Sequence, residues 1–209
     1  MSDTPFEFLI YAFDLFGTMA FAVTGAFKAI EHKSDIVGIV ILSIITGVAG
    51  GTIRDIIIGR FPPNSIIDPF YVIVCVSSGA ALFFLHPHLK KHWNVFLKFD
   101  AIGIGVFSIT GATFAYNVFG LNFLAIAFAG ILTAVGGGIL RDVFVNEVPI
   151  VFVKELYVTA SFVGIVLFYM LLVIEAPLYA ATVVGITTTT VLRLVAMKYN
   201  WNLPRAREK

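Results

Sequence analysis

The chain has 209 residues, of which 59% are hydrophobic and only 13% are charged, and its formal net charge is +1. Soluble domains are about half apolar and about one-quarter charged, so this composition excludes an ordinary soluble protein and indicates one that is solvated by lipid. The single cysteine, Cys75, excludes an internal disulfide and a metal site built from cysteines.

Charged and turn-forming residues divide the chain into seven apolar stretches of about 20 residues, each long enough to cross a bilayer as a helix. In chain order, the predicted spans are residues 8–28, 36–59, 66–85, 99–119, 121–145, 156–174 and 177–197. The first stretch has no basic leader or cleavage site, so we expect a retained helix and not a signal peptide. The loops are short, and residues 1–209 are therefore expected to form a single all-α transmembrane domain.

The positions of the lysines and arginines predict the orientation of the chain. With seven spans, Arg60 is the one basic residue of the 14 on the side of the amino terminus, and Arg54 and Arg141 lie inside spans. The other eleven lie on the opposite side: Lys28, Lys33, Lys90, Lys91, Lys98, Lys154, Arg193, Lys198, Arg205, Arg207 and Lys209. Because positive loops stay in the cytoplasm, the amino terminus is expected outside and the carboxyl terminus inside, in the cell (inner) membrane of a prokaryote.

Two stretches of the chain repeat each other. Phe13-Asp14, followed by Val23-Thr24-Gly25-Ala26, returns 86 residues later as Phe99-Asp100, followed by Ile109-Thr110-Gly111-Ala112. Residues 46–55 return as residues 133–142, and both copies contain Gly-Gly-x-x-Arg-Asp. The repeat has three spans (8–85 and 99–174), an odd number, so the second copy is predicted to cross the membrane in the opposite direction. The span at 177–197 lies outside this inverted 3+3 repeat.

Glycines interrupt the second and fifth spans at equivalent positions, namely Gly50, Gly51, Gly136, Gly137 and Gly138. Adjacent glycines favour a kink or a break in a helix, and such a site in a membrane must be buried in protein or line a wet cavity. The alternative is close packing of helices through small residues.

Arg54 and Arg141 lie inside spans, where an arginine costs at least ~2.5 kcal/mol and needs a partner. The adjacent Asp55 and Asp142 point ~100° away on an ideal helix, so we expect them to be poor partners for these arginines. Asp14 and Arg54 are expected at similar depths in the membrane, and so are Asp100 and Arg141. This predicts two other ion pairs, Asp14–Arg54 and Asp100–Arg141, one near each mouth of the membrane domain. A purely structural role for these pairs is the alternative.

Other polar residues are weaker candidates for an ion pathway. Thr24 and Thr110 could offer hydroxyls to a passing ion or serve close packing. Lys28 is expected to reach the membrane interface, or else a pore mouth. Glu147 is interpreted as solvated in a loop. The basic loop at residues 86–92 and the tail at 205–209 are expected to contact membrane lipid, with metal binding by the loop histidines the weaker alternative.

No nucleophile–base–acid set, phosphate loop or metal-ligand spacing occurs in the sequence, so we expect neither an enzyme nor a cofactor or metal. A nucleic-acid partner is not expected either.

The doubled Gly-Gly-x-x-Arg-Asp motif, in inverted three-span repeats with a seventh span, resembles the prokaryotic trimeric intracellular cation (TRIC) channels. That group overlaps a bacterial family also described as glycine transporters. The resemblance implies a homotrimer with a potassium-conducting pore in each protomer. It also implies that the second and fifth helices are kinked at their glycines and line the pore with the first and fourth. Animal members carry a lysine-containing motif in place of Gly-Gly-Ile-Leu-Arg-Asp, so their calcium, voltage and lipid responses are not carried over.

The leading functional hypothesis is therefore a channel for monovalent cations, chiefly potassium. Carboxylates near each mouth (Asp14, Asp55, Asp100 and Asp142) would raise the local cation concentration. A secondary transporter of glycine or another small solute is the first alternative, because inverted repeats and broken helices suit it equally. A membrane assembly without flux is the second.

Overall fold

The computed structural model describes residues 5–89, 93–153, 156–199 and 201, and within these residues the ordered elements are all helices. Seven helices are long: α1 (Pro5–Glu31), α2 (Ile36–Ile57), α4 (Pro69–Leu89), α5 (Trp93–Phe119), α6 (Phe123–Phe144), α8 (Tyr157–Val173) and α9 (Leu178–Tyr199). Two single-turn helices, α3 (Asn64–Ile67) and α7 (Ile150–Val153), precede α4 and α8. Each predicted span overlaps one of the long helices.

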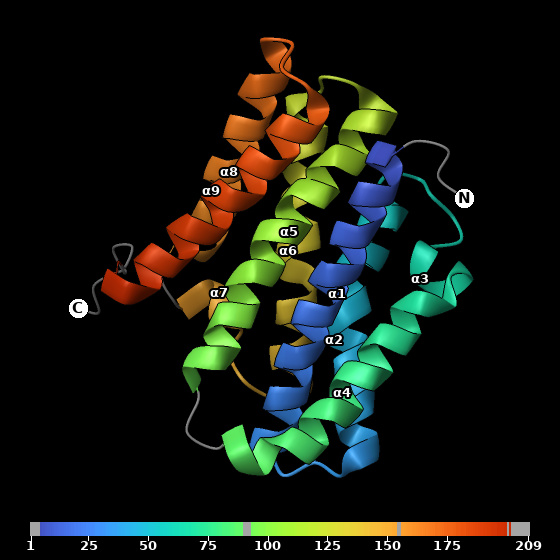
Figure 1. The fold of residues 1–209 in the computed structure, drawn as a ribbon, viewed down its shortest axis with the longest axis vertical. Helices are drawn as coiled ribbons and strands as arrows, with labels where there is room; N and C mark the ends of the chain where they lie inside the picture. The colour runs from blue at the N-terminus through green and yellow to red at the C-terminus, as the bar shows by residue number, and fades with distance from the viewer. Residues whose placement is uncertain (1–4, 90–92, 154–155, 200, 202–209) are drawn as a thin grey trace, which may run out of the picture.

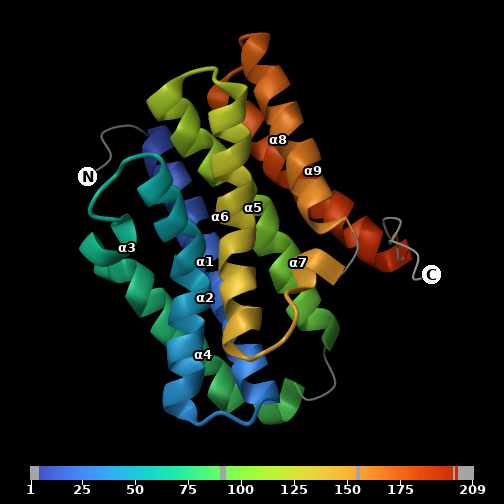
Figure 2. The same ribbon diagram turned by 180° about the vertical axis from the view of Figure 1, so that it is seen from behind.

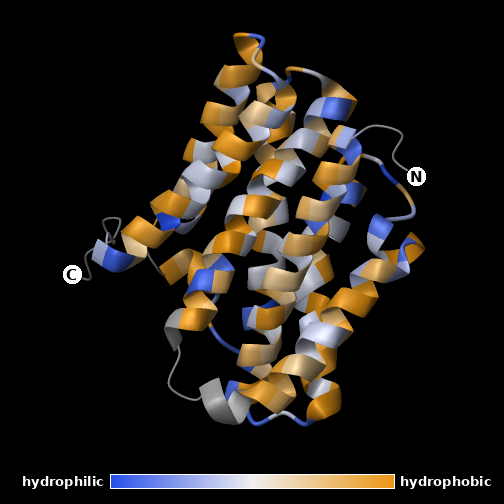
Figure 3. Cartoon of the chain, in the orientation of Figure 1, coloured by the Kyte–Doolittle hydropathy of each residue, from blue (hydrophilic) through white to orange (hydrophobic). Residues whose placement is uncertain are grey.

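Length and composition suit five of these helices to crossing a membrane, namely α1, α2, α5, α6 and α9. The other two, α4 and α8, are apolar over shorter stretches, at residues 69–85 and 157–173. Large apolar side chains face outward on many helices, for example Phe84 and Leu124, which are 70% and 76% exposed. Figure 3 shows hydrophobic residues along most of the helices and hydrophilic ones mainly near their ends. This surface suits a multi-pass membrane protein, because lipid solvates apolar side chains.

Side-chain caps mark where α2 and α6 begin. Asp35 Oδ1 accepts a hydrogen bond from Gly38 N (2.7 Å) at the start of α2, and Asn122 Oδ1 accepts one from Ala125 N (3.2 Å) at the start of α6. Each cap satisfies a backbone N–H that has no partner within its own helix. The turn between α5 and α6 is made by Gly120, whose φ of 61° costs a glycine little.

The four helices α1, α2, α5 and α6 form the centre of the molecule (Figures 1 and 2). On one side, α4 packs against α1 and α2, and on the other, α8 packs against α5, α6 and α9. Figure 1 shows α1 running down from the amino terminus and α5 running up beside it. The helix triplets α1–α2–α4 and α5–α6–α8 are thus arranged as the inverted repeat requires.

Gly50, Gly136 and Gly137 lie where α2 and α6 cross. A methyl group placed on Gly50 would collide with the carbonyl oxygen of Thr133, and one placed on Gly137 would collide with that of Thr46. Both helices are continuous through their glycines, so the chain is not broken there, and a kink stays a prediction. Close packing through small residues, the alternative to a break, is what these contacts show.

Two phenylalanines occupy the middle of the central layer. Phe21 and Phe107, which are 86 residues apart, stack with ring centroids 5.2 Å apart and are at most 1% exposed. Each ring lies against a glycine of the facing helix, Phe107 against Gly17 and Phe21 against Gly103. The two repeats therefore meet at the centre through equivalent side chains, as expected close to a pseudo-twofold axis.

Candidate functional site

A buried polar cluster, here called the first cluster, surrounds Arg54 of α2. The guanidinium lies 2.8 Å from Asp14 Oδ1 through Nη1 and 2.9 Å from Asp55 Oδ1 through Nε, and all three side chains are 1% exposed. The remaining oxygens also have partners. The Tyr71 hydroxyl donates to Asp14 Oδ2 (2.8 Å), and the Asn64 backbone N–H donates to Asp55 Oδ2 (2.8 Å).

The second cluster repeats this arrangement around Arg141 of α6. Its Nη1 lies 3.0 Å from Asp100 Oδ1 and its Nε lies 2.8 Å from Asp142 Oδ1. The Tyr157 hydroxyl donates to Asp100 Oδ1 (3.2 Å), and the Ile150 backbone N–H donates to Asp142 Oδ2 (2.8 Å). The predicted pairs Asp14–Arg54 and Asp100–Arg141 are thus both present in the structure.

Each cluster is completed by a threonine from the other repeat. Thr110 of α5 donates to Asp14 Oδ1 (3.3 Å) in the first cluster, and Thr24 of α1 accepts from Arg141 Nη1 (2.9 Å) in the second. Both threonines are fully buried. Their hydroxyls therefore hold the two repeats together in this conformation, and the neighbouring Gly25 and Gly111 pack against Thr46 and Thr133.

The expectation that Asp55 and Asp142 are poor partners for their own arginines is wrong. The ~100° step describes where side chains leave a helix, but an arginine is long enough to fold back along its own helix. A methyl on Gly51 would lie 3.6 Å from Arg54 Nη2, and one on Gly138 would lie 3.7 Å from Arg141 Nη2. Each guanidinium therefore lies over the second glycine of its own motif, and the adjacent aspartate is then within reach of Nε.

Lys28 and Glu147 have partners that the sequence did not predict. Lys28 is 3% exposed, so its side chain is enclosed by protein. Its ammonium lies 2.8 Å from Glu147 Oε2 and 3.2 Å from Glu31 Oε2, so the Glu147 carboxylate is half-buried and paired. This contact joins the end of α1 to the loop after α6, which the linear sequence separates by more than one hundred residues.

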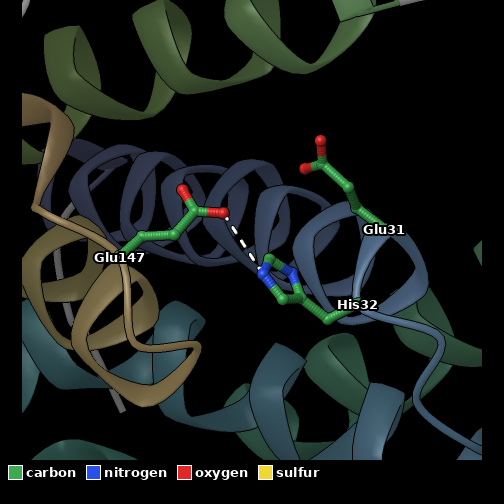
Figure 4. Close-up of side chains that lie close together, drawn as sticks. All are labelled: Glu31, His32 and Glu147. Atoms are coloured by element: carbon green, nitrogen blue, oxygen red, sulfur yellow. Dashed lines mark ion pairs between the residues drawn. The ribbon is translucent and has the colours of Figure 1, made fainter.

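His32, Glu31 and Glu147 come close enough to resemble a metal site, with ligand atoms within 4.8 Å of one another. Figure 4 shows His32 and Glu147 facing each other, and His32 Nε2 lies 3.3 Å from Glu147 Oε1. Two of these residues are exposed, and the Lys28 ammonium already lies against both carboxylates. A metal cation would have to displace this lysine, so the arrangement is better explained as a salt-bridge cluster.

Sequence reasoning missed the tyrosines of both clusters and Arg193. Tyr71 and Tyr157 each follow the aspartate that they contact by 57 residues, so the repeat itself could have identified them. The position of Arg193 in the sequence placed it among the basic residues near the cytoplasm. In the structure its side chain is fully buried, and its Cζ lies 4.8 Å from the centroid of the Tyr157 ring. It lies outside the duplication, so no internal comparison pointed to it.

Comparison with protein families agrees with this duplicated architecture. A family model described as "Glycine transporter" matches residues 11–87 and again residues 97–173. The two matches begin 86 residues apart, the same offset as between the first pair of motifs. The chain belongs to this family.

Known relatives and solved structures match the chain over most of its length. The UPF0126 inner membrane protein YadS of Escherichia coli is 33% identical over 199 residues, which cover 94% of this chain and 95% of YadS. A prokaryotic TRIC channel crystallised in 0.5 M KCl has a TM-score of 0.88 at 31% identity, covering 94% of this chain and 100% of the other. The TRIC orthologue from Rhodobacter sphaeroides has a TM-score of 0.87 at 34% identity, covering 91% and 98%.

These matches confirm the resemblance to the prokaryotic TRIC channels and identify the fold as the TRIC fold. The relatives are named as cation channels and as membrane proteins.

Proposed function

We propose that the protein is a channel for monovalent cations, chiefly potassium, with a pore in each protomer lined by α1, α2, α5 and α6. The observation that carries this proposal is the pair of buried clusters in the four-helix centre, each holding one arginine against two aspartates. Such a group has a formal charge of −1. The TRIC channels to which the fold is similar add support.

An excess of buried negative charge favours cations over anions, since a charge surrounded by protein is screened less than one in water. Asp14 and Asp55 act near one mouth of the proposed pore, and Asp100 and Asp142 near the other. Thr24, Thr110 and Lys28 lie on the same helices and are proposed to border the ion pathway. Pairing with aspartates keeps Arg54 and Arg141 from repelling the cations.

In this conformation, we propose, the pathway is closed between the clusters. The stacked Phe21 and Phe107 rings and the contact of Gly50 with Thr133 leave no room there for a hydrated ion. Bending of α2 at Gly50-Gly51 and of α6 at Gly136–Gly138 would separate the two backbones. Glycine-containing segments are the places where a long helix bends most readily, so these positions are proposed as kinks.

The proposed channel is a homotrimer in the cell (inner) membrane, crossed seven times by each chain, with the amino terminus outside and the carboxyl terminus in the cytoplasm. Apolar side chains on the outer faces of α4 and α8, such as Phe84 and Phe162, are available for lipid or for neighbouring protomers. The basic loop at residues 86–92 and the tail at residues 205–209, whose side chains lie outside the described part of the structure, are proposed from the sequence to contact lipid headgroups.

A secondary transporter of glycine is the second candidate, and the description of the family model favours it. Inverted repeats that pack around a central crossing suit alternating access as well as they suit a channel. The arrangement of the buried charges argues for the channel, because each cluster has its arginine already neutralised and so offers little to a glycine carboxylate.

Electrical recording separates the candidates. Purified protein, with its trimeric mass checked by light scattering, is added to planar bilayers in potassium chloride, and the same preparation is tested for uptake of labelled glycine into vesicles. Unitary currents that reverse near the potassium equilibrium potential support the channel. Saturable glycine uptake without such currents would establish the transporter instead, and the absence of both would favour an assembly without flux.

A further inference from the structure

The ends of α2 and α6 repeat each other beyond the Gly-Gly-x-x-Arg-Asp motif. Both helices end in the same capping turn, with Gly59 at a φ of 76° after α2 and Asn146 at a φ of 59° after α6. The next residue donates its backbone N–H to the carbonyl oxygen of the motif aspartate, at 2.8 Å for Arg60 and at 2.9 Å for Glu147. The turn therefore holds Arg60 and Glu147 at equivalent points beside the two clusters.

These two residues contact the first helix of the other repeat by different chemistry. Glu147 Oε2 lies 2.8 Å from the ammonium of Lys28 in α1. Arg60 lies over the ring of Phe114 in α5, with its Cζ 5.8 Å from the centroid. Lys28 and Phe114 are themselves equivalent, because they are 86 residues apart. The duplicated fold thus makes the same connection twice, once as an ion pair and once as a cation–π contact.

Each connection is separated from an arginine cluster by one aromatic ring. The centroid of the Phe96 ring lies 6.0 Å from Lys28 Nζ and 4.9 Å from Arg141 Cζ. The Phe114 ring, which Arg60 contacts, lies 4.0 Å from Arg54 Cζ. The ion pair therefore belongs to the end of the four-helix centre that holds the second cluster, and the cation–π contact to the end that holds the first.

The ion pair is the stronger of the two connections. The side chain of Lys28 is 4% exposed, and both oxygens of Glu147 accept hydrogen bonds from it, at 3.0 and 2.8 Å. His32, also from the end of α1, adds a contact of 3.3 Å between its Nε2 and Glu147 Oε1 (Figure 4). Charges attract more strongly where water is excluded, whereas Arg60 is exposed and its contact is screened by solvent.

Lys28 also contacts a second carboxylate. Glu31 Oε2 lies 3.2 Å from the same ammonium, three residues further along α1. This second ion pair stays within α1, so it contributes charge to the site and does not bring two helices together. Of the two glutamates, Glu147 is the one that connects α1 to the end of α6.

We propose that Glu147 holds the mouth of the channel beside the second cluster closed, by tying the end of α6 to α1 through Lys28. The proposal rests on the proposed channel function. Bending of α6 at Gly136–Gly138 carries the segment after these glycines away from α1, and the ion pair opposes that movement. The equivalent contact of Arg60 is weaker, so its loss changes channel opening less.

Open probability in planar bilayers tests this proposal. Glu147→Gln and Glu31→Gln each remove one negative charge from beside Lys28, so the two variants are matched in charge. Glu147→Gln should raise the open probability about fivefold or more, whereas Glu31→Gln and Arg60→Gln should change it by less than about twofold. The removed charge itself should lower the unitary current by similar amounts in both glutamate variants.

Cysteine labelling follows the same movement without a current. Thr24→Cys, in a Cys75→Ala background, places a thiol in the buried contact of α1 with Arg141. N-ethylmaleimide crosses membranes, so the orientation of the protein does not affect the result. Adding Glu147→Gln should raise the labelling rate about fivefold or more, and adding Glu31→Gln should leave it unchanged.

An open probability or a labelling rate that is the same in Glu147→Gln and Glu31→Gln would overturn the proposal, even where wild-type currents are normal. Wild-type protein without currents would overturn the channel function instead, and the labelling rates would then still decide whether Glu147 holds α6 against α1. If Glu147→Gln misfolds, Glu147→Asp replaces it, because it keeps the charge and withdraws the carboxylate by one methylene. A wild-type open probability in Glu147→Asp would also overturn the proposal.

Discussion

Arg54 and Arg141 each lie within a long apolar helix and are at most 1% exposed. Burial of a single charge is expensive in lipid or protein, but here each guanidinium contacts two carboxylates. In the first cluster every carboxylate oxygen has a partner, from an arginine, a tyrosine or a backbone amide. Networks satisfied this fully hold a single geometry, since any displacement leaves several buried groups unpaired at once.

Asp14→Asn should therefore destabilise the protein by about 3 kcal/mol or more, because it leaves Arg54 with one carboxylate in place of two. For a chain of this length the corresponding decrease in Tm is about 6–12 °C, measured by thermal unfolding in detergent. The exposed Glu175→Gln serves as a control and should leave Tm unchanged. An unaltered Tm for Asp14→Asn would show that Asp55 alone satisfies the arginine.

At the scale of elements, the glycines of the two Gly-Gly-x-x-Arg-Asp motifs divide into two groups by the direction they face. Gly50 and Gly137 face the other helix and lie against the Thr133 and Thr46 carbonyls, whereas Gly51 faces its own Arg54. Only the first group sets how closely α2 and α6 approach. Helices in membranes associate mainly by such close packing, so the crossing depends on the absence of a side chain at these positions.

Gly50→Ala and Gly137→Ala should each destabilise the fold by about 1–3 kcal/mol, since the new methyl meets backbone atoms that cannot rotate away. Gly51→Ala should be neutral or stabilising, because its methyl makes an ordinary contact at 3.6 Å and alanine favours a helix over glycine by about 1 kcal/mol. Thermal unfolding of the three variants side by side provides the measurement. Equal Tm values for Gly50→Ala and Gly51→Ala would contradict the assignment of the two groups.

At the scale of the whole molecule, the inverted arrangement places the two clusters toward opposite ends of the same four-helix centre. The first joins residues of α1, α2 and α4, and the second joins residues of α5, α6 and α8. Helices α1 and α5 run in opposite directions, so equivalent residues lie at opposite depths (Figure 1). The distribution of basic residues then predicts which cluster faces the cytoplasm, namely the second.

Cysteine labelling tests this orientation in a Cys75→Ala background. Leu121→Cys, in the turn between α5 and α6, should react with a membrane-impermeant maleimide in intact spheroplasts. Ser34→Cys, in the turn between α1 and α2, should react only after the membrane is permeabilised. The reverse pattern would overturn the predicted orientation, and labelling of both cysteines in intact spheroplasts would overturn the predicted number of spans between them.

The sequence by itself determined the class of protein, the approximate helices, the duplication and the two long-range ion pairs. These follow from the composition, the lengths of the apolar stretches and the offset of 86 or 87 residues between the two repeats, all of which are properties of the sequence. The ion pairs follow in addition from the high cost of an unpaired charge in lipid. Tertiary structure alone decided the other contacts. Arg54 reaches Asp55 by folding back over Gly51, the glycines at the crossing serve packing without a break, and α9 brings Arg193 to Tyr157. The physical reason is that these contacts depend on how far a flexible side chain bends and on how closely two helices approach, and neither distance is encoded in the spacing of residues along one helix.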